Sequence, residues 1–290
     1  MSNPPAEPVV VPAAAKVNLF LRVLSREADG WHGIETLFCR LALADELVAE
    51  PVPGDEVTLT VEGPDTGPVE DNLAVRAARE ALRATGRRFG VRLTLRKRIP
   101  IAAGLGGGSA DAAAALEAVN RLAGDAIPRS ELMHAAARLG ADVPFCLSGA
   151  PLALGWGHGE RLLRLPALPQ APVLLLSPDV SVRTAEAYAW VAEARASAGR
   201  RGALVLDTAV LSSWSDVARM AGNDFESAVF GRFPAVRGAF EALAETRPLL
   251  CRMSGSGSTI FAVYRNPRDR EDARARLGRK HGTIILTETA

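Results

Sequence analysis

The chain has 290 residues, of which 48% are hydrophobic and 23% are charged, and its formal net charge is +1. These values are typical of a globular protein with one or two domains, and they exclude an intrinsically disordered chain. The balanced charge also argues against a protein held to nucleic acid mainly by attraction to phosphates.

The termini and the cysteines favour a cytoplasmic protein. Residues 1–16 lack a basic segment followed by a long apolar run, so we expect no secretory signal. The apolar stretch 172–178 is too short to cross a bilayer. Cys39, Cys146 and Cys251 form neither a close pair nor a zinc-ligand spacing, and we expect them to be buried and reduced. No pair of histidines has ligand spacing either, so no metal site is predicted.

Helical and strand patterns alternate along the chain and predict a mixed α and β protein. A proline-rich segment at 166–172 predicts a domain boundary, with residues 1–10 a loose lead-in, 11–166 the first domain and 167–290 the second. Residues 151–164 are expected to form strand and turn, and residues 198–202 a basic loop. Further strands are expected over 17–24, 56–61, 91–95, 173–176, 260–264 and 283–286, and helices over 72–85, 109–122, 131–139, 184–196, 235–245 and 268–280.

A cluster of glycines precedes the helix expected from residue 109. Gly104, Gly106, Gly107 and Gly108 have no Cβ, so backbone N–H groups can converge there on an anion. The helix N-terminus behind them adds the positive end of a dipole. Ser109 is placed to cap this helix, and its hydroxyl can instead face a phosphate oxygen or a metal. The segment has neither the Lys-Ser/Thr ending of a Walker loop nor the third glycine of a dinucleotide fingerprint, and the alternative is a flexible turn with a good cap.

The segment 97–115 (KRIPIAAGLGGGSADAAAA) resembles the phosphate-loop motif of the GHMP small-molecule kinases. Other segments resemble the same family in order and spacing, and the pattern is most similar to a branch whose substrate carries a cytidine diphosphate group. Trp31 stands where that branch usually has Tyr, which keeps an aromatic face for a base but removes a phenol hydroxyl. These segments are 15–20, 29–38 (DGWHGIETLF), 71–73 (DNL), 139–144 (LGADVP), 181–188, 223–226 (NDFE, expected to be structural in part) and 253–261.

The resemblance implies an α+β fold of two domains with the active site in the cleft between them. The N-terminal domain would be ribosomal protein S5 domain 2-like and the C-terminal domain ferredoxin-like. The implied activity is ATP-dependent phosphorylation of a hydroxyl group on a small cytidylated substrate. Mg²⁺ is expected to accompany ATP without a dedicated carboxylate cage, and we expect a monomer or weak homodimer that binds neither nucleic acid nor membrane.

The resemblance also implies roles for single residues. Asp142 would take or orient the proton of the attacking hydroxyl, and Lys16 would hold Asp142 and that hydroxyl. Trp31, His32 and Tyr188 would hold the cytidine. The residues expected to bind ATP are Asn72, Lys97, Pro100, Gly104, Leu105, Gly106, Gly107, Gly108 and Ser109, with Asn72 and Lys97 near the adenine and ribose. Those expected to bind the second substrate are Asn18, Trp31, His32, Thr184, Tyr188, Gly255, Ser256 and Gly257.

Several of these residues also have a purely structural explanation. Lys16 can be a surface residue before a strand, and Asp142 can cap a turn. Asn72 can cap a helix, and Lys97 can be a solvated strand end. Tyr188 can be a half-buried packing residue, and the Gly/Ser segment over 253–259 can be a bulge or tight loop.

Two other functions are compatible with the glycine loop. One is a different kinase of the family, acting on homoserine or mevalonate, which the segment around Trp31 and His32 argues against. The other is a non-catalytic phosphate-binding or regulatory module, which predicts loss of Lys16 or Asp142, whereas both are present.

Overall fold

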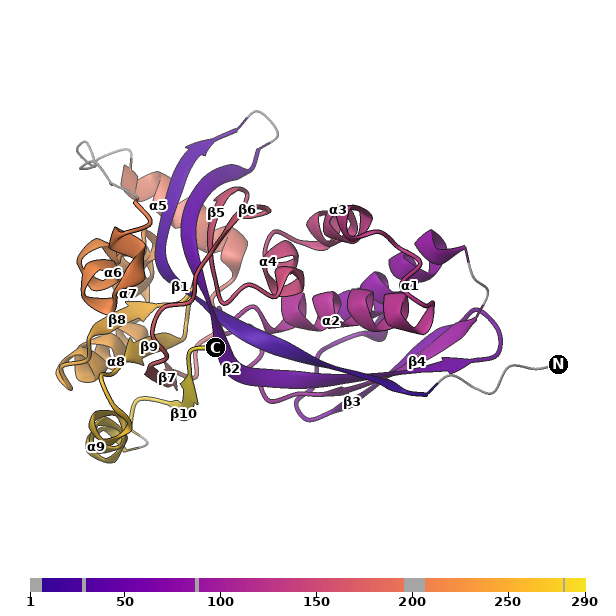
Figure 1. The fold of residues 1–290 in the computed structure, drawn as a ribbon. Coiled ribbons are helices and arrows are strands. Elements are labelled where there is room, and N and C mark those ends of the chain that lie inside the picture. The colour runs from indigo at the N-terminus through magenta and orange to yellow at the C-terminus, as the bar shows by residue number, and fades with distance from the viewer. Residues whose placement is uncertain (1–6, 28–29, 87–88, 196–206, 279) are drawn as a thin grey trace. The chain divides into compact units, whose positions relative to one another are not determined.

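The computed structural model describes residues 7–27, 30–86, 89–195, 207–278 and 280–290. They fold into two compact units, each discontinuous in sequence. The first unit comprises Met1–Ala15, Leu43–Ile101 and Gly106–Gly149, and the second comprises Lys16–Ala42, Ala102–Leu105 and Ala150–Ala290. These units do not follow the predicted boundary between residues 166 and 167, because the long strands β1 (Val9–Arg26) and β2 (His32–Val52) each contribute to both units (Figure 1).

The first unit packs helices against one face of a sheet (Figure 1). Strand β4 (Gly90–Arg96) pairs in parallel with β3 (Val57–Glu62) and antiparallel with the second half of β2. The helices are α1 (Leu73–Thr85), α2 (Gly107–Leu122), α3 (Arg129–Leu139) and α4 (Val143–Ser148), with a short 3-10 turn η1 (Val69–Asp71) before α1.

Alanines fill much of the core of the first unit. Ala74, Ala77, Ala78 and Ala81 of α1 are buried, as is the run of alanines in α2. Alanine has the highest helix propensity and its side chain ends at Cβ, so two helices rich in alanine can pack closely together. The Ala-rich sequence that predicts a helix therefore also specifies how closely α1 and α2 approach.

The second unit contains two groups of strands. The first half of β2 pairs with β5 (Leu152–Gly157), which forms a hairpin with β6 (Arg161–Leu165). A separate antiparallel sheet has the order β10-β7-β9-β8. Its strands are β7 (Pro172–Ser177), β8 (Leu250–Met253), β9 (Ile260–Val263) and β10 (Thr283–Glu288), and the helices of this unit are α5 (Thr184–Arg195), α6 (Trp214–Met220), α7 (Phe225–Arg232), α8 (Pro234–Ala244) and α9 (Pro267–Leu277), with η2 (Val210–Ser212) before α6.

The antiparallel sheet has the topology that the family resemblance implies for the C-terminal domain. A strand is followed by helices, a two-stranded hairpin, a helix and a last strand that pairs with the first, as in ferredoxin-like folds. Strand β7 lies in the middle of this sheet, and Val173 to Leu176 are fully buried. A continuous apolar run is what a strand covered on both faces requires.

Every predicted helix and strand is present, with shifts of up to three residues at its ends except in β1, which begins at Val9 where a start at residue 17 was expected. Several further elements were not predicted. Val9 and Val10, which we expected in a loose lead-in, belong to β1. The long strand β2, the short helices α4, α6 and α7, and strand β8 were missed. The expected basic loop over 198–202 lies outside the described residues.

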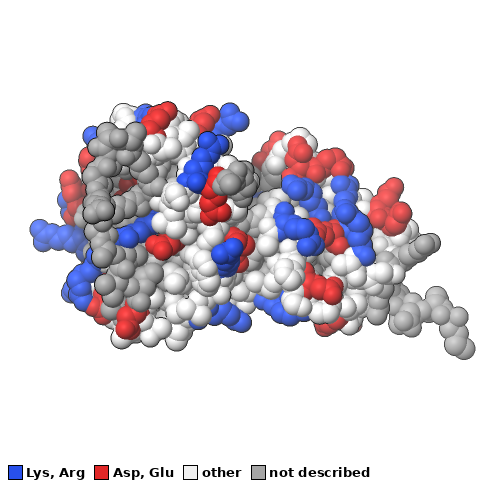
Figure 2. All heavy atoms as spheres, turned by 90° about the horizontal axis from the view of Figure 1, so that it is seen from above, with Lys and Arg blue, Asp and Glu red and all other residues white. Residues whose placement is uncertain are grey.

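The three thiols are free, as predicted, but only Cys39 is fully buried, whereas Cys146 and Cys251 are half-buried. Among the described residues, no helix combines the length and apolar character needed to span a bilayer. Lys and Arg are interspersed with Asp and Glu on the face shown in Figure 2, in agreement with the balanced composition.

Candidate active site

The glycine loop leads directly into the N-terminus of α2. The helix begins at Gly107, two residues earlier than expected, and its N-cap residue is Gly106 with φ 72°. The prediction that Ser109 caps this helix is therefore wrong, since Ser109 lies within the first turn. No side chain caps α2, and the first N–H groups of a helix have no intrahelical acceptor. With no Cβ at Gly107 or Gly108, these amides form a donor set that fits a phosphate group.

In the second unit, Gly104 packs tightly against the Gly/Ser loop over 253–259. Its φ is 77°, and a Cβ at this position would overlap the carbonyl oxygen of Ser254 and lie 3.0 Å from that of Gly257. The Ser254 hydroxyl donates a 2.9 Å hydrogen bond to the carbonyl of Gly104, and Thr259 N donates to the carbonyl of Ala103. The Gly/Ser loop thus supports the start of the glycine loop, and only glycine fits at position 104.

Lys16 is buried next to the same loop. Its side chain donates to Asn18 Oδ1 at 2.8 Å and to the carbonyl of Gly104 at 3.3 Å, and its backbone N–H donates to Leu105. Asn18 in turn donates to the hydroxyl of Thr36 at 2.8 Å. The residue is only 3% exposed, so the surface explanation for Lys16 is wrong. A hydrogen-bonded ammonium group is thereby held beside the glycine loop.

Asp142 lies in the first unit, immediately before α4. It is half-buried, and its backbone carbonyl accepts the hydrogen bond from Cys146 N. Its side chain forms no capping hydrogen bond to α4, so capping of that helix does not explain the carboxylate. Because Lys16 and Asp142 belong to different units, their pairing stays a prediction.

Two of the three aromatic residues predicted to hold a base, His32 and Tyr188, contact each other in the second unit. The rings of His32 and Tyr188 stack with centroids 5.3 Å apart and planes inclined by 16°. Tyr188 also meets Phe225 edge-on at 4.9 Å, so it is a packing residue as well. Trp31 is 63% exposed, and its ring lies 5.7 Å from that of His158. The exposed indole and the stacked pair each offer an aromatic face to a planar ligand.

Helix α5 connects this aromatic group to the Gly/Ser loop. Thr184, at the start of α5, lies one turn before Tyr188, and its hydroxyl is 3.1 Å from that of Ser256. Asn223 donates two 2.7 Å hydrogen bonds to the carbonyls of Met253 and Gly255 and thereby fixes the loop. The structural role expected for the segment over 223–226 is confirmed by these bonds.

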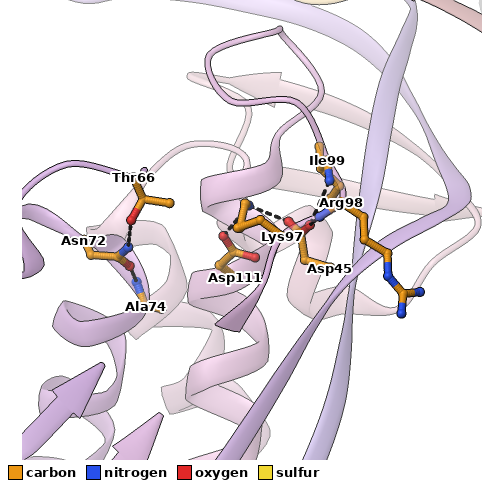
Figure 3. Close-up of polar contacts among 8 residues, drawn as sticks. All are labelled: Asp45, Thr66, Asn72, Ala74, Lys97, Arg98, Ile99 and Asp111. Atoms are coloured by element: carbon orange, nitrogen blue, oxygen red, sulfur yellow. Dashed lines mark hydrogen bonds and ion pairs between the residues drawn. The ribbon is translucent and has the colours of Figure 1, made fainter. Parts of the chain in front are cut away.

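Two further predicted residues, Asn72 and Lys97, have their side chains engaged within the first unit (Figure 3). Asn72 caps α1 by accepting from Ala74 N at 2.9 Å. The Lys97 ammonium lies 2.5 Å from Asp45 and 2.7 Å from Asp111, and its side chain is 3% exposed. The alternative of a solvated strand end is therefore wrong for Lys97.

Comparisons with known proteins show the family to which this chain belongs. Residues 72–150 match the family model for the GHMP kinases N terminal domain, and residues 203–283 match the model for the GHMP kinases C terminal domain. A 4-diphosphocytidyl-2-C-methyl-D-erythritol kinase from Pelotomaculum thermopropionicum is 38% identical over 96% of this chain and 96% of its own length. The chain belongs to the GHMP kinase family.

Solved structures of GHMP kinases share the fold. A crystal structure of 4-(cytidine 5'-diphospho)-2C-methyl-D-erythritol kinase has a TM-score of 0.80 and 37% identity, covering 97% of this chain and 100% of that one. Homoserine kinase from Cytophaga hutchinsonii has a TM-score of 0.73 at 19% identity, covering 100% and 96%. The second likeness concerns the fold alone.

Sequence reasoning missed two carboxylates of this GHMP kinase, Asp45 and Asp111, which enclose Lys97. They lie 52 and 14 residues from Lys97 in the chain, so no local pattern links the three. Of the two, only Asp111 could have been recognised from the sequence, because a carboxylate within a run of alanines on a buried helix requires a polar or charged partner. No group of three His, Cys, Asp or Glu side chains suited to a metal occurs among the described residues.

Gly104→Ala should destabilise this GHMP kinase by about 3 kcal/mol, because a methyl group would both strain the backbone and overlap the carbonyl of Ser254. Gly149→Ala is the matched control: its φ is 73°, but no atom lies within 4 Å of the added Cβ, so it should lose only about 1 kcal/mol. Urea denaturation of the two variants measures the difference. Equal losses would show that the close approach at Gly104 contributes nothing.

The stability of Asp111→Asn relative to wild type should be higher at pH 8 than at pH 5. Burial raises the pKa of Asp111 to about 7, with Lys97 opposing and Asp45 adding to the rise. Since the folded pKa lies above the unfolded value, ionisation costs stability progressively between about pH 4 and pH 7. The variant has no such titration, so its melting temperature relative to wild type should increase with pH.

Glu70→Gln is the control for this pH dependence. Glu70 is exposed, and its hydrogen bond with Arg79 lowers its pKa. The stabilisation by its ionised carboxylate is therefore nearly complete at pH 5. The difference in melting temperature between Glu70→Gln and wild type should stay constant from pH 5 to pH 8. If the difference in melting temperature between Asp111→Asn and wild type is equally constant, the pKa of Asp111 is not raised in the folded protein.

Proposed function

We propose that this protein transfers the γ-phosphoryl group of ATP to the 2-hydroxyl of 4-diphosphocytidyl-2-C-methyl-D-erythritol. The products are the 2-phosphate and ADP, and the step belongs to the non-mevalonate isoprenoid pathway. The observation that carries this proposal is the match to kinases of that name along nearly the whole chain. The burial of Lys16 beside the glycine loop supports it, because a buried, hydrogen-bonded ammonium is suited to charge stabilisation.

The nucleotide end of the site is proposed to be the glycine loop and the start of α2. Gly104 to Ser109 would present backbone N–H groups to the phosphates, with Pro100 and Leu105 shaping the loop. The uncapped N-terminus of α2 supports this assignment, because anions are stabilised there by free donors and the helix dipole. Asn72 is proposed to lie near the adenine and ribose, as part of its role in starting α1.

Phosphoryl transfer requires in-line positioning and charge stabilisation more than covalent participation by the protein. Asp142 is proposed to accept the proton of the attacking hydroxyl, as the resemblance of the segment 139–144 to the family implies. Lys16 is proposed to orient the same hydroxyl and to offset the negative charge that develops on the transferred group.

The second substrate is proposed to occupy the residues gathered around α5. Its cytosine would lie against Trp31, His32 and Tyr188, which offer an exposed indole and a stacked pair. The methylerythritol diphosphate would meet the polar groups nearby, namely Asn18, Thr184, Gly255, Ser256 and Gly257.

Mg²⁺ is proposed to arrive with ATP and to neutralise charge on its phosphates. Phosphate oxygens and water are expected to supply most of its ligands, with the Ser109 hydroxyl a candidate from the protein. We further propose a cytoplasmic monomer or weak homodimer without a nucleic-acid partner, in line with the net charge of +1.

The substrate assignment is tested by coupled ADP release with three acceptors: 4-diphosphocytidyl-2-C-methyl-D-erythritol, homoserine and mevalonate. ADP formation should depend on the cytidylated acceptor, because only that substrate uses the aromatic group around Trp31. Faster turnover of homoserine or mevalonate would replace this proposal by another small-molecule kinase. Absence of turnover with all three would favour a non-catalytic nucleotide-binding relative.

Asp142→Asn should lower kcat by about 10²–10⁴-fold, because the amide cannot accept the hydroxyl proton. The affinity for ATP and the melting temperature should stay close to wild type. Asp55→Asn, the same change at an exposed site of the same unit, is the control and should keep full activity. Wild-type kcat in Asp142→Asn would exclude Asp142 as the proton acceptor.

A further inference from the structure

The ammonium group of Lys97 is enclosed by two carboxylates in the first unit (Figure 3). It lies 2.5 Å from Asp45 Oδ2 and 2.7 Å from Asp111 Oδ2. The side chains of Lys97, Asp45 and Asp111 are 3%, 0% and 4% exposed. We call these three residues the lysine cluster. It connects three segments that are distant in sequence: β2, the end of β4 and the second turn of α2.

Asp45 also holds the backbone at which the glycine loop begins. Its Oδ1 accepts hydrogen bonds from Arg98 N at 2.5 Å and from Ile99 N at 2.8 Å. The two oxygens of one carboxylate therefore fix both the Lys97 ammonium and the first residues after β4. Such charge-assisted bonds to backbone N–H groups are among the stronger hydrogen bonds in proteins.

The lysine cluster also contacts the segment where the loop ends. A Cβ added to Gly107, the first residue of α2, would lie 3.4 Å from Lys97 Nζ and 3.1 Å from Ile99 Cγ2. Asp111 anchors the same ammonium to α2 four residues later. Both ends of the segment between Ile99 and Gly107 are thus attached to one buried ion pair.

Stability alone does not explain this cluster. Burying charges costs several kcal/mol per ion, and apolar side chains of similar volume often serve a core equally well. The second oxygen of Asp111, Oδ1, accepts no hydrogen bond from the residues that the structure describes, so the cluster is not optimised as a network. What the lysine cluster does is hold the chain on both sides of the glycine loop, at Arg98 and Ile99 before it and at α2 after it.

We propose that the lysine cluster positions the glycine loop, so that its amides are arranged for the ATP phosphates before the nucleotide binds. Lys97 then acts through Asp45 and Asp111 as a positioning residue, and this proposal replaces the direct contact near the adenine and ribose that the family resemblance implies for it. Donors that are fixed in advance bind an anion without the cost of ordering the loop. This inference rests on the proposed kinase function and deepens it.

The test compares Asp45→Asn and Lys97→Met with controls at the neighbouring positions, Glu46→Gln and Arg96→Met. Glu46 and Arg96 form an ion pair of the same type that is exposed to solvent, so the controls remove equal charge from the same strands. The measurements are the Kd for ATP by calorimetry, the KM for the cytidylated substrate and the melting temperature.

Asp45→Asn and Lys97→Met should raise the Kd for ATP by at least tenfold, while the KM for the cytidylated substrate stays within twofold of wild type. A merely structural role would lower the melting temperature without this split between substrates. Amide hydrogen exchange in a peptide covering residues 98–110 should become faster in both variants, and both controls should resemble wild type.

Lys97→Met leaves two buried carboxylates without their ammonium partner, so this single variant can fail to fold. The double variant Lys97→Met/Asp111→Leu removes one of those carboxylates as well and replaces the single variant in that case. It should fold and still bind ATP at least tenfold more weakly than wild type. The inference is overturned if the Kd for ATP rises less than fivefold in the folded variants, or if the KM for the cytidylated substrate rises by the same factor. In either case, turnover by the wild-type protein would still support the kinase function. Failure of the wild-type protein to bind ATP would instead overturn the proposed function itself.

Discussion

The candidate active site depends on close approach of backbone to backbone at the glycine loop. At Gly104 the chain passes so near to the carbonyls of Ser254 and Gly257 that a Cβ cannot be accommodated. Two residues later, Gly106 adopts a left-handed conformation and ends the loop at the start of α2. Glycine at these two points allows the close approach and the left-handed turn, after which the first amides of α2 have no side-chain cap and are available to an anion.

Carboxylates and amides support the loops from segments that are distant in sequence. In the first unit, Asp45 binds the backbone after β4 and the ammonium of Lys97. In the second unit, Asn223 performs the corresponding task for the Gly/Ser loop by donating to two of its carbonyls. A loop rich in glycine loses much conformational entropy on ordering, so fixed anchors on both sides lower the cost of a defined shape.

This arrangement also explains how a chain of nearly zero net charge can be suited to phosphates. Lys16 and Lys97 are both buried, and the ammonium of each is held by named acceptors. Surface ion pairs such as Arg79 with Glu70 balance the remaining charges. In the proposed site, recognition of the ATP phosphates would rely on oriented backbone dipoles and on the ammonium of Lys16, so a global excess of positive charge would not be required.

The sequence by itself determined the order of helices and strands with strong periodicity, the glycine loop and the family motifs. Helix α1 illustrates this, because its apolar spacing, its Asn72 cap and its Gly86 stop are all local signals. Strand β2 was missed because its two halves pair with different strands, β5 and β4, and its 21 residues show no single alternation. The cap of α2 was misplaced because Ser109 has the preferred side chain, whereas the left-handed Gly106 has the required backbone conformation. Only the tertiary structure decided that Lys16 and Lys97 are buried and that Asp45 and Asp111 enclose Lys97. Ion pairs across 14 and 52 residues depend on how strands and helices pack, and no periodicity along the chain encodes that packing.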